Sequence, residues 1–203
     1  MASTNENGRL EMFSDGVFAI AITLLVLEIK VPPLDTIHSV SDLWQGLRKL
    51  GPSYFAFALS FLFIFIAWGN HHVTFRLVDK SSSFFIYANG FLLLTLVFLP
   101  FPTALLATYI RTEYAQPAAV FYCFSYILQN IGWNLLYESI LNRTALLKPS
   151  ISISKVKGLR KNARFGFIVF LSTTFLAWWF PLTAITINTS LFLLWIKMSR
   201  VEH

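Results

Sequence analysis

The sequence predicts an all-α integral membrane protein with six transmembrane helices per subunit. Hydrophobic residues make up 56% of its 203 residues and charged residues only 13%, whereas charged residues are about a quarter of an average soluble domain. Six apolar runs each approach the length of about 20 residues that a helix needs to cross a bilayer. Most Lys and Arg residues fall in alternate loops between these runs, which is typical of a chain that crosses a membrane repeatedly.

The chain, residues 1–203, is expected to form a single membrane domain. The third apolar run carries Asn89 and Gly90 and then Pro100 and Pro102, so we expect its far end to be kinked or to end early. Pro181 separates the last two runs and predicts a tight hairpin between them. The expected spans in chain order are residues 13–29, 54–68, 84–106, 118–137, 165–180 and 182–196.

Two connecting segments have patterns of their own. In the first external loop, apolar residues recur at helical spacing from Val40 to Leu50, after Ser39 or Ser41 as a possible cap. This pattern predicts a short helix that lies in the membrane interface. Residues 147–164 are rich in Ser and Lys and predict a basic cytoplasmic connector, with attraction to anionic lipid headgroups as a second interpretation.

The basic residues predict how the chain is oriented. With six spans, one side of the membrane holds twelve of the sixteen Lys and Arg residues, and the other holds only Lys30, Arg48, Lys49 and Arg111. Because Lys and Arg in short loops stay cytoplasmic, both termini are expected in the cytoplasm. The first apolar run is too long for a cleavable signal peptide, so we expect it to remain in the membrane.

The net charge of +6 raises the alternative of nucleic-acid binding. That function requires basic residues gathered on a folded soluble face. Here they lie in loops between apolar spans, so no nucleic-acid partner is expected. The single cysteine, Cys123, excludes an intrachain disulfide and a thiolate metal cluster.

The first span has one face of particular interest. Gly16, Ile20, Thr23 and Leu27 fall within an arc of roughly 60° on a helix, with Leu24 beside them. This face either packs against a neighbouring helix or lines a narrow symmetric pore. In a pore, Ile20 and Leu27 form an apolar constriction, and Thr23 between them supplies the side-chain oxygens.

Polar residues gather at the expected cytoplasmic end of the first two spans. Ser14 and Asp15 precede the apolar run, where either could cap the helix. Arg9 lies about a turn and a half earlier and could pair with Asp15, within or between subunits. His71 and His72 end the second span at the same depth. The group is either a hydrogen-bond network that responds to pH or a set of solvated histidines beside an interfacial tryptophan.

The string Arg9-x-x-x-Phe13-Ser14-Asp15, which runs directly into the first span, resembles the signature of a known channel family. This is the lysosomal and endosomal potassium channel family known as transmembrane protein 175. The resemblance implies a homotetramer in which the first helices surround the pore without a Thr-Val-Gly-Tyr-Gly filter, and that string is absent from this sequence. The motif residues are then expected to tie the inner ends of the helices together, and His71 is assigned to the same network.

The same resemblance implies which residues line the pore. Ile20 corresponds to the family's apolar constriction, and Thr23, Leu24 and Leu27 match further pore-lining positions. The expected function is therefore a potassium-permeable, leak-type cation channel in the plasma membrane of a prokaryote. Its expected partners are potassium ions, membrane lipid and further copies of the chain, with no cofactor and no metal beyond permeating potassium.

Other functions are weaker interpretations of the sequence. A secondary transporter or proton-conducting protein would use His71, His72 or Glu138 as titrating groups, but the chain has no paired mid-membrane carboxylates and no inverted halves. A membrane enzyme or assembly factor is the third possibility. The chain has no His-Glu-x-x-His and no Gly-x-Ser-x-Gly, so no enzyme activity is expected.

Overall fold

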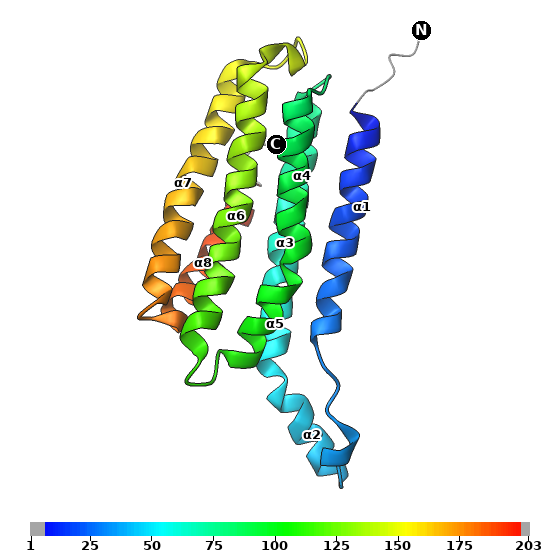
Figure 1. Ribbon diagram of the computed structural model, residues 1–203, viewed down its shortest axis with the longest axis vertical. Helices are drawn as coiled ribbons and strands as arrows, with labels where there is room; N and C mark the ends of the chain where they lie inside the picture. Colours follow the sequence, from blue (N-terminus) through cyan, green and yellow to red (C-terminus); the bar gives the residue numbers. More distant parts are fainter. Residues whose placement is uncertain (1–6, 200–203) are drawn as a thin grey trace.

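The chain folds into helices that run alongside one another (Figure 1). The computed structural model describes residues 7–199, with side chains through residue 191. No strand occurs in this part of the chain, apart from one isolated bridge between Val78 and Leu147. The prediction of an all-α protein is therefore confirmed. The α-helices are α1 (Gly8–Leu24), α2 (Val40–Lys49), α3 (Gly51–Leu77), α4 (Ser83–Phe98), α5 (Pro100–Tyr109), α6 (Ala115–Asn142), α7 (Ile153–Ala177) and α8 (Pro181–Ser199). Three short 3-10 turns are η1 (Leu25–Glu28), η2 (Leu34–Thr36) and η3 (Thr144–Leu146).

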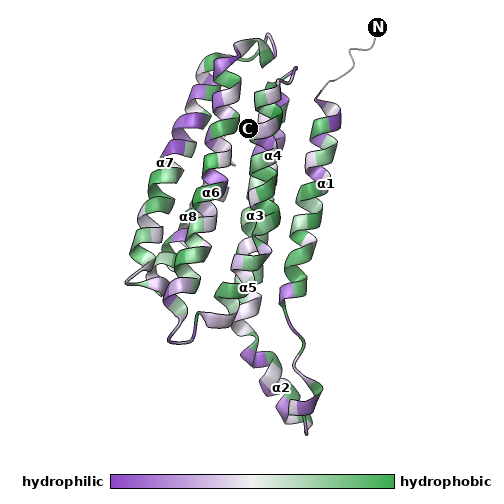
Figure 2. Ribbon diagram, viewed as in Figure 1, coloured by the Kyte–Doolittle hydropathy of each residue, from purple (hydrophilic) through white to green (hydrophobic). Residues whose placement is uncertain are grey.

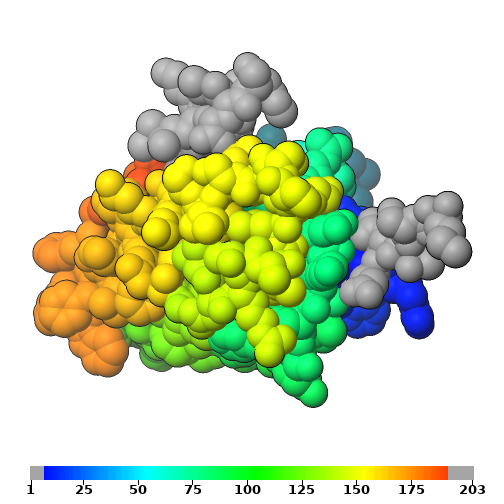
Figure 3. Space-filling model, turned by 90° about the horizontal axis from the view of Figure 1, so that it is seen from above, coloured from blue at the N-terminus to red at the C-terminus, as the bar shows by residue number. Residues whose placement is uncertain are grey.

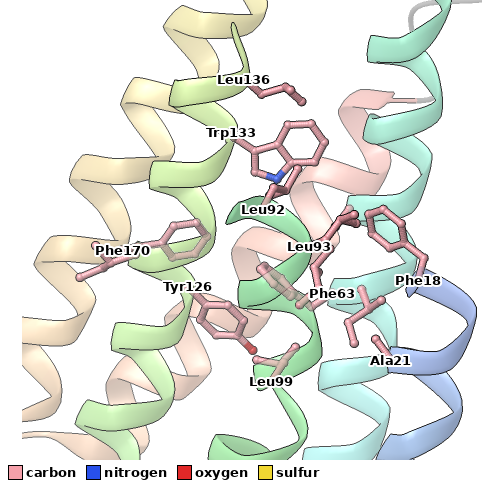
Figure 4. Close-up of a cluster of buried hydrophobic side chains, with 14 of the residues drawn as sticks. Phe18, Ala21, Phe63, Leu92, Leu93, Leu99, Tyr126, Trp133, Leu136 and Phe170 are labelled. Atoms are coloured by element: carbon pink, nitrogen blue, oxygen red, sulfur yellow. The ribbon is translucent and has the colours of Figure 1, made fainter. Parts of the chain in front are cut away.

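The helix α6 is at the centre of the packing. It contacts α4 and α5 on one side and α7 and α8 on the other, whereas α1 packs against α3 and α4 at one edge of the bundle (Figure 1). Figure 4 shows the core between them, in which Phe18 and Ala21 of α1 lie toward Leu93 of α4, and Phe63 of α3 packs on Tyr126 of α6. One face of α1 is therefore part of the subunit core, and the rest of its surface is free of neighbours within the subunit.

Three helical segments are long and apolar enough to cross a membrane: Gly8–Glu28, Gly51–Leu77 and Ser83–Tyr109. Figure 2 shows the apolar middle of these helices and the more polar residues at both ends of the bundle. The helices α6 and α7 are of similar length to these segments, but polar side chains in the second half of α6 and basic ones in the first half of α7 lower their mean hydropathy. The protein is thus an integral membrane protein by fold and composition, and the count of six spans stays a prediction.

Two predicted breaks are confirmed. The third run divides at Leu99 into α4 and α5, and the two prolines lie in the first turn of α5, where a missing amide proton costs no helical hydrogen bond. The helices α7 and α8 are joined only by residues 178–180, and Pro181 is the first residue of α8. The predicted hairpin is therefore present.

The predicted short helix is α2, and Ser39 is its N-cap, accepting a 3.1 Å hydrogen bond from the amide of Asp42. It projects obliquely beyond the end of α3 (Figure 1). Most of the predicted connector, residues 147–164, is helical, because α7 begins at Ile153 and includes its residues 153–164. Val156 is fully buried and Arg160 pairs with Glu138 of α6, and these contacts hold the basic segment as a helix.

The first helix begins earlier than expected. It starts at Gly8 with Asn7 in the N-cap position, so Ser14 and Asp15 lie inside the helix and the interpretation that they cap it is wrong. The α-helix also ends at Leu24, and Leu27 lies in the tighter 3-10 turn η1. Leu10 in this added segment packs partly against the core, and no Gly or Pro after Gly8 interrupts the helix before Ser14.

The loops divide between the two ends of the bundle as six crossings require. The start of α1, the turn between α3 and α4, and the connector between α6 and α7 lie at one end (Figures 1 and 3). We call this the motif end. The helix α2, the loop between α5 and α6, and the hairpin between α7 and α8 lie at the other (Figure 1). The termini themselves and Arg200, which the orientation prediction includes, lie outside the described residues.

Candidate functional site

The helix α1 has two faces of different character. Ser14, Phe18, Ala21 and Leu25 recur at helical spacing and are buried against α3, α4 and α5. Phe18 and Ala21 are apolar and Ser14 is satisfied by hydrogen bonds, so burial of this face favours docking of α1 on the subunit. The docked face fixes which residues α1 presents to the outside.

The opposite face of α1 carries the residues predicted to line a pore. The side chains of Ile20, Leu24 and Leu27 are 58%, 37% and 61% exposed on the isolated subunit. Thr23 is exposed between them, and a Cβ atom added at Gly16 would have no neighbour within 4 Å. An exposed apolar face of this kind marks a surface for another protein copy or for lipid.

The hydroxyl of Thr23 has a defined orientation. It donates a 2.9 Å hydrogen bond to the backbone oxygen of Ile20, one turn earlier in the same helix. The proton is therefore engaged with the backbone, and the oxygen lone pairs remain available as acceptors. Thr23 can act as a cation ligand on an otherwise apolar face.

A buried hydrogen-bond chain joins α1, α4 and α3 near the motif end. Ser14 Oγ donates to the backbone oxygen of Leu10 at 2.8 Å. Because that proton is used, Ser14 accepts from Asn89 Nδ2 at 2.9 Å. Asn89 Oδ1 is then left to accept from His71 Nε2 at 2.8 Å. Ser14, Asn89 and His71 are all fully buried, so the chain requires the Nε2–H tautomer of His71.

Aromatic rings enclose the imidazole of His71. Phe75 stacks on it at a centroid distance of 4.2 Å, and Phe18 meets it edge-on at 5.2 Å. The other ring nitrogen, Nδ1, is buried and has no hydrogen-bond partner among the described residues. The ring is thus held in one orientation by one hydrogen bond and two aromatic contacts.

A second set of contacts joins α1 to α3 nearer the surface. Trp68 Nε1 donates a 2.9 Å hydrogen bond to Asp15 Oδ1. His72 stacks on the Trp68 ring at 6.2 Å, and its Nδ1 lies 3.3 Å from a carboxylate oxygen of Glu11. These contacts and the buried chain of Ser14, Asn89 and His71 together attach the first half of α1 to its neighbours.

The predicted motif residues divide into two groups. The structure brings Ser14, Asp15 and His71 into these contacts. Arg9 and Phe13 are exposed, and Arg9 makes no ion pair with Asp15 in this single subunit. The described residues contain no cluster of three His, Cys, Asp or Glu side chains that could hold a metal ion.

Sequence reasoning missed Asn89 and Glu11 as site residues. Asn89 was read only as a sign of a break in the third span, although a lone amide in an apolar run is a signal of a buried polar contact. Glu11 gave no signal, because its partner His72 is 61 positions away in the chain and no pattern of spacing joins them.

Comparison with known proteins identifies the family. Residues 9–100 match the family described as "Endosomal/lysosomal potassium channel TMEM175". A potassium channel of Chamaesiphon minutus is 43% identical over 178 residues, which cover 86% of this chain and 87% of that protein. A potassium channel of Streptomyces collinus is 37% identical over 174 residues, covering 85% and 83%.

The fold agrees with a solved structure. A crystal structure of a lysosomal potassium-selective channel TMEM175 homolog from Chamaesiphon minutus superposes with a TM-score of 0.86 at 38% identity, covering 96% of this chain and 98% of that one. This is a family of ion channels and not of enzymes. The share of each chain that is covered and the degree of identity lead to one conclusion: the chain belongs to the TMEM175 potassium-channel family.

Proposed function

We propose that this chain is one subunit of a homotetrameric, leak-type potassium channel in which α1 lines the pore. The observation that carries the proposal is the exposure of Ile20, Leu24 and Leu27 on the subunit surface, away from the face of α1 that is buried in the core. The names of the relatives as potassium channels supply the permeant ion.

The apolar side chains form the constriction in this proposal. Around a symmetry axis, Ile20, Leu24 and Leu27 from each copy make rings of branched apolar groups. Narrow apolar rings resist wetting, so they limit flux without a conserved filter of backbone carbonyls. Potassium loses its hydration shell more readily than smaller cations, and so enters such a constriction at lower cost.

Thr23 provides the polar ring between the apolar ones. Its hydroxyl proton is bonded to the Ile20 backbone, so its oxygen faces outward as an acceptor. A ring of such oxygens partly replaces the water that a cation sheds at Ile20. Thr23 therefore favours cations over anions at the narrowest part of the pore.

The contacts of Ser14, Asn89, His71, Asp15 and Trp68 position the pore helix in the proposal. They join the first half of α1 to α3 and α4, so the helix cannot rotate its apolar face away from the axis without breaking buried hydrogen bonds. Exposed Arg9 and Phe13 are then free to contact a neighbouring subunit.

The orientation follows from charge. The motif end carries most of the basic residues and is proposed to face the cytoplasm of a prokaryotic cell. The six segments proposed to cross the plasma membrane are α1, α3, α4 together with α5, α6, α7 and α8. The permeating potassium ion needs no cofactor in this scheme.

Reconstitution of the purified protein tests the proposed function. Potassium-loaded liposomes should lose potassium down its gradient, with less sodium flux under the matched sodium gradient. A pH-sensitive dye in parallel liposomes separates potassium from proton permeation, and cross-linking of the same sample counts the subunits. Folded tetrameric protein that carries no potassium, or that carries only protons, would contradict the proposal.

A further inference from the structure

A polar cavity lies at the motif end, beside the contacts of Glu11 and Phe75 described above. It has a volume of about 210 Å³, and its lining residues come from the start of α1, the end of α3, the turn before α4 and the connector before α7. This volume is larger than one water molecule needs, so a ligand of several atoms fits in it. The residues that line it are Asn7, Glu11, Phe75, Arg76, Val78, Asp79 and Lys148.

Asn7 is a buried residue of the cavity whose side chain lacks hydrogen-bond partners in the part of the chain that the structure describes. Its side chain is only 2% exposed, and both Oδ1 and Nδ2 have no hydrogen-bond partner among the described residues. Although Asn7 occupies the N-cap position of α1, its side chain does not cap the helix. A buried amide without a partner is costly, and such groups usually mark a site that another molecule completes.

The charged side chains of the cavity are arranged without neutralising one another. Arg76 and Lys148 are cationic, and Glu11 and Asp79 are anionic. Within the described part of the chain, Glu11 contacts His72, but Arg76, Asp79 and Lys148 form no ion pair. Opposite charges therefore line one cavity while three of them remain unpaired.

This balance of charge defines the ligand. A simple anion is attracted by Arg76 and Lys148 but repelled by Glu11 and Asp79. A simple cation is attracted by the two carboxylates but repelled by the two basic side chains. A ligand that carries both a phosphate and an ammonium group satisfies both pairs. The N-terminus of α1 beside Asn7 adds a favourable dipole for the phosphate.

The walls of the cavity are held in place by backbone hydrogen bonds. The amide of Lys148 donates to the backbone oxygen of Leu77 at 3.0 Å, and the amide of Asp79 donates to Leu146 at 2.8 Å. These bonds fix the connector against the turn between α3 and α4. The site is thus preorganised on three sides, and α1 forms the fourth.

We infer that this cavity binds a phosphate ester bearing a primary ammonium group, as in the headgroup of an aminophospholipid or in free phosphoethanolamine. Arg76 and Lys148 bind the phosphate, Asp79 and Glu11 receive the ammonium group, and Asn7 donates to a phosphate oxygen. The ligand joins the start of α1 to the α3–α4 turn and the connector. Pockets of this kind at the cytoplasmic ends of membrane helices suit lipid headgroups.

Lipid retention measured by native mass spectrometry tests the inference. The full-length protein is incubated with short-chain phosphatidylethanolamine, phosphatidylcholine or phosphatidylglycerol, and with phosphoethanolamine alone. We expect preferential retention of the ethanolamine lipid, because a quaternary choline nitrogen cannot donate hydrogen bonds to the carboxylates. Competition by phosphoethanolamine at equal affinity identifies a soluble ligand, whereas retention only of the lipid identifies the membrane as the source.

Variants assign the binding to this cavity. Arg76→Gln and Asp79→Asn should each lower retention about tenfold or more, as expected for the loss of a charge-assisted hydrogen bond. The controls Lys80→Gln and Asp35→Asn remove the same charges at exposed positions outside the cavity and should leave retention unchanged.

Three results would overturn the inference: equal retention of the choline and ethanolamine lipids, a preference for phosphatidylglycerol over the ethanolamine lipid, or retention unaffected by both cavity variants. Because the readout is binding, it does not depend on whether the protein conducts potassium. Failure here and failure of the proposed channel function are therefore separate results.

Discussion

Asn89 is the residue that most clearly links α1 to the helices on which it packs. It accepts from His71 and donates to Ser14, so one amide satisfies two buried side chains on two other helices. Removing an amide of this kind leaves both partners buried without a hydrogen bond, which costs more than the bonds themselves contribute.

Asn89→Ala is predicted to lower the stability of the protein by about 1–3 kcal/mol, because Ser14 and His71 each lose a buried partner. The measurement is the thermal unfolding midpoint of detergent-solubilised protein. Asn134→Ala is the matched control, because its amide bonds only to Asn130 of the same helix and is half-buried. A smaller loss for Asn89→Ala than for Asn134→Ala would contradict the assigned role.

At the scale of elements, the sequence predicted the helix breaks, the hairpin and the helix cap, all of which depend on a few neighbouring residues. Pro100 and Pro102 predicted the break between α4 and α5, and Pro181 predicted the hairpin. Of the two caps offered for α2, Ser39 or Ser41, the structure shows Ser39. Hydrophobic periodicity also selected one face of α1. These features depend on a few neighbouring residues, which is why the sequence alone indicates them.

The features that were missed depend on contacts between distant segments. The first three turns of α7 are helical because Val156 is buried and Arg160 reaches Glu138 on another helix. Similarly, the partnership of Asn89 with His71 joins two helices whose relative rotation no local pattern reveals. Both the helical start of α7 and the contact of Asn89 with His71 depend on tertiary packing, about which sequence periodicity carries no information.

The contact between α4 and α6 depends on a single glycine. A Cβ atom at Gly132 would lie 3.0 Å from Leu92 Cα and 3.1 Å from Leu92 Cβ, which is tighter than nine in ten Cβ contacts in proteins. Because one of these atoms belongs to the backbone, relief requires the two helices to separate. Small residues allow this close approach of helices in lipid.

Gly132→Ala is therefore predicted to destabilise the protein by about 1–3 kcal/mol through overpacking. Gly158→Ala is the matched control in α7, where an added Cβ meets nothing within 4 Å and the better helix propensity of Ala should keep or raise stability. Thermal unfolding of both variants in detergent provides the comparison. Equal unfolding midpoints for Gly132→Ala and Gly158→Ala would show that α4 and α6 separate at no cost, and would contradict the prediction.

At the scale of the whole molecule, the loops alternate between two ends of the bundle (Figure 1). This arrangement and the asymmetry of basic residues together predict six crossings with the connector in the cytoplasm. Ser150 in the connector and Thr112 in the loop between α5 and α6 are exposed and lie at opposite ends.

Labelling of introduced cysteines tests this topology. The only natural cysteine, Cys123, is fully buried and should not react. With a membrane-impermeant maleimide on intact cells or spheroplasts, Thr112→Cys should be labelled, and Ser150→Cys should be labelled only in inverted vesicles. Labelling of both positions from the same side would exclude six crossings.

The central claim is that α1 lines the pore, and potassium flux through Ile20→Asn liposomes tests it most directly. Ile168→Asn on α7 is the control, because Ile168 is the same residue type with a similar exposure, 61% against 58%. An amide in a narrow apolar ring should lower the barrier by about 1.4 kcal/mol, which raises flux about tenfold, and should reduce the preference for potassium over sodium. Ile168→Asn should leave both unchanged. Folded Ile20→Asn protein with the flux and selectivity of the unmodified channel would contradict the claim.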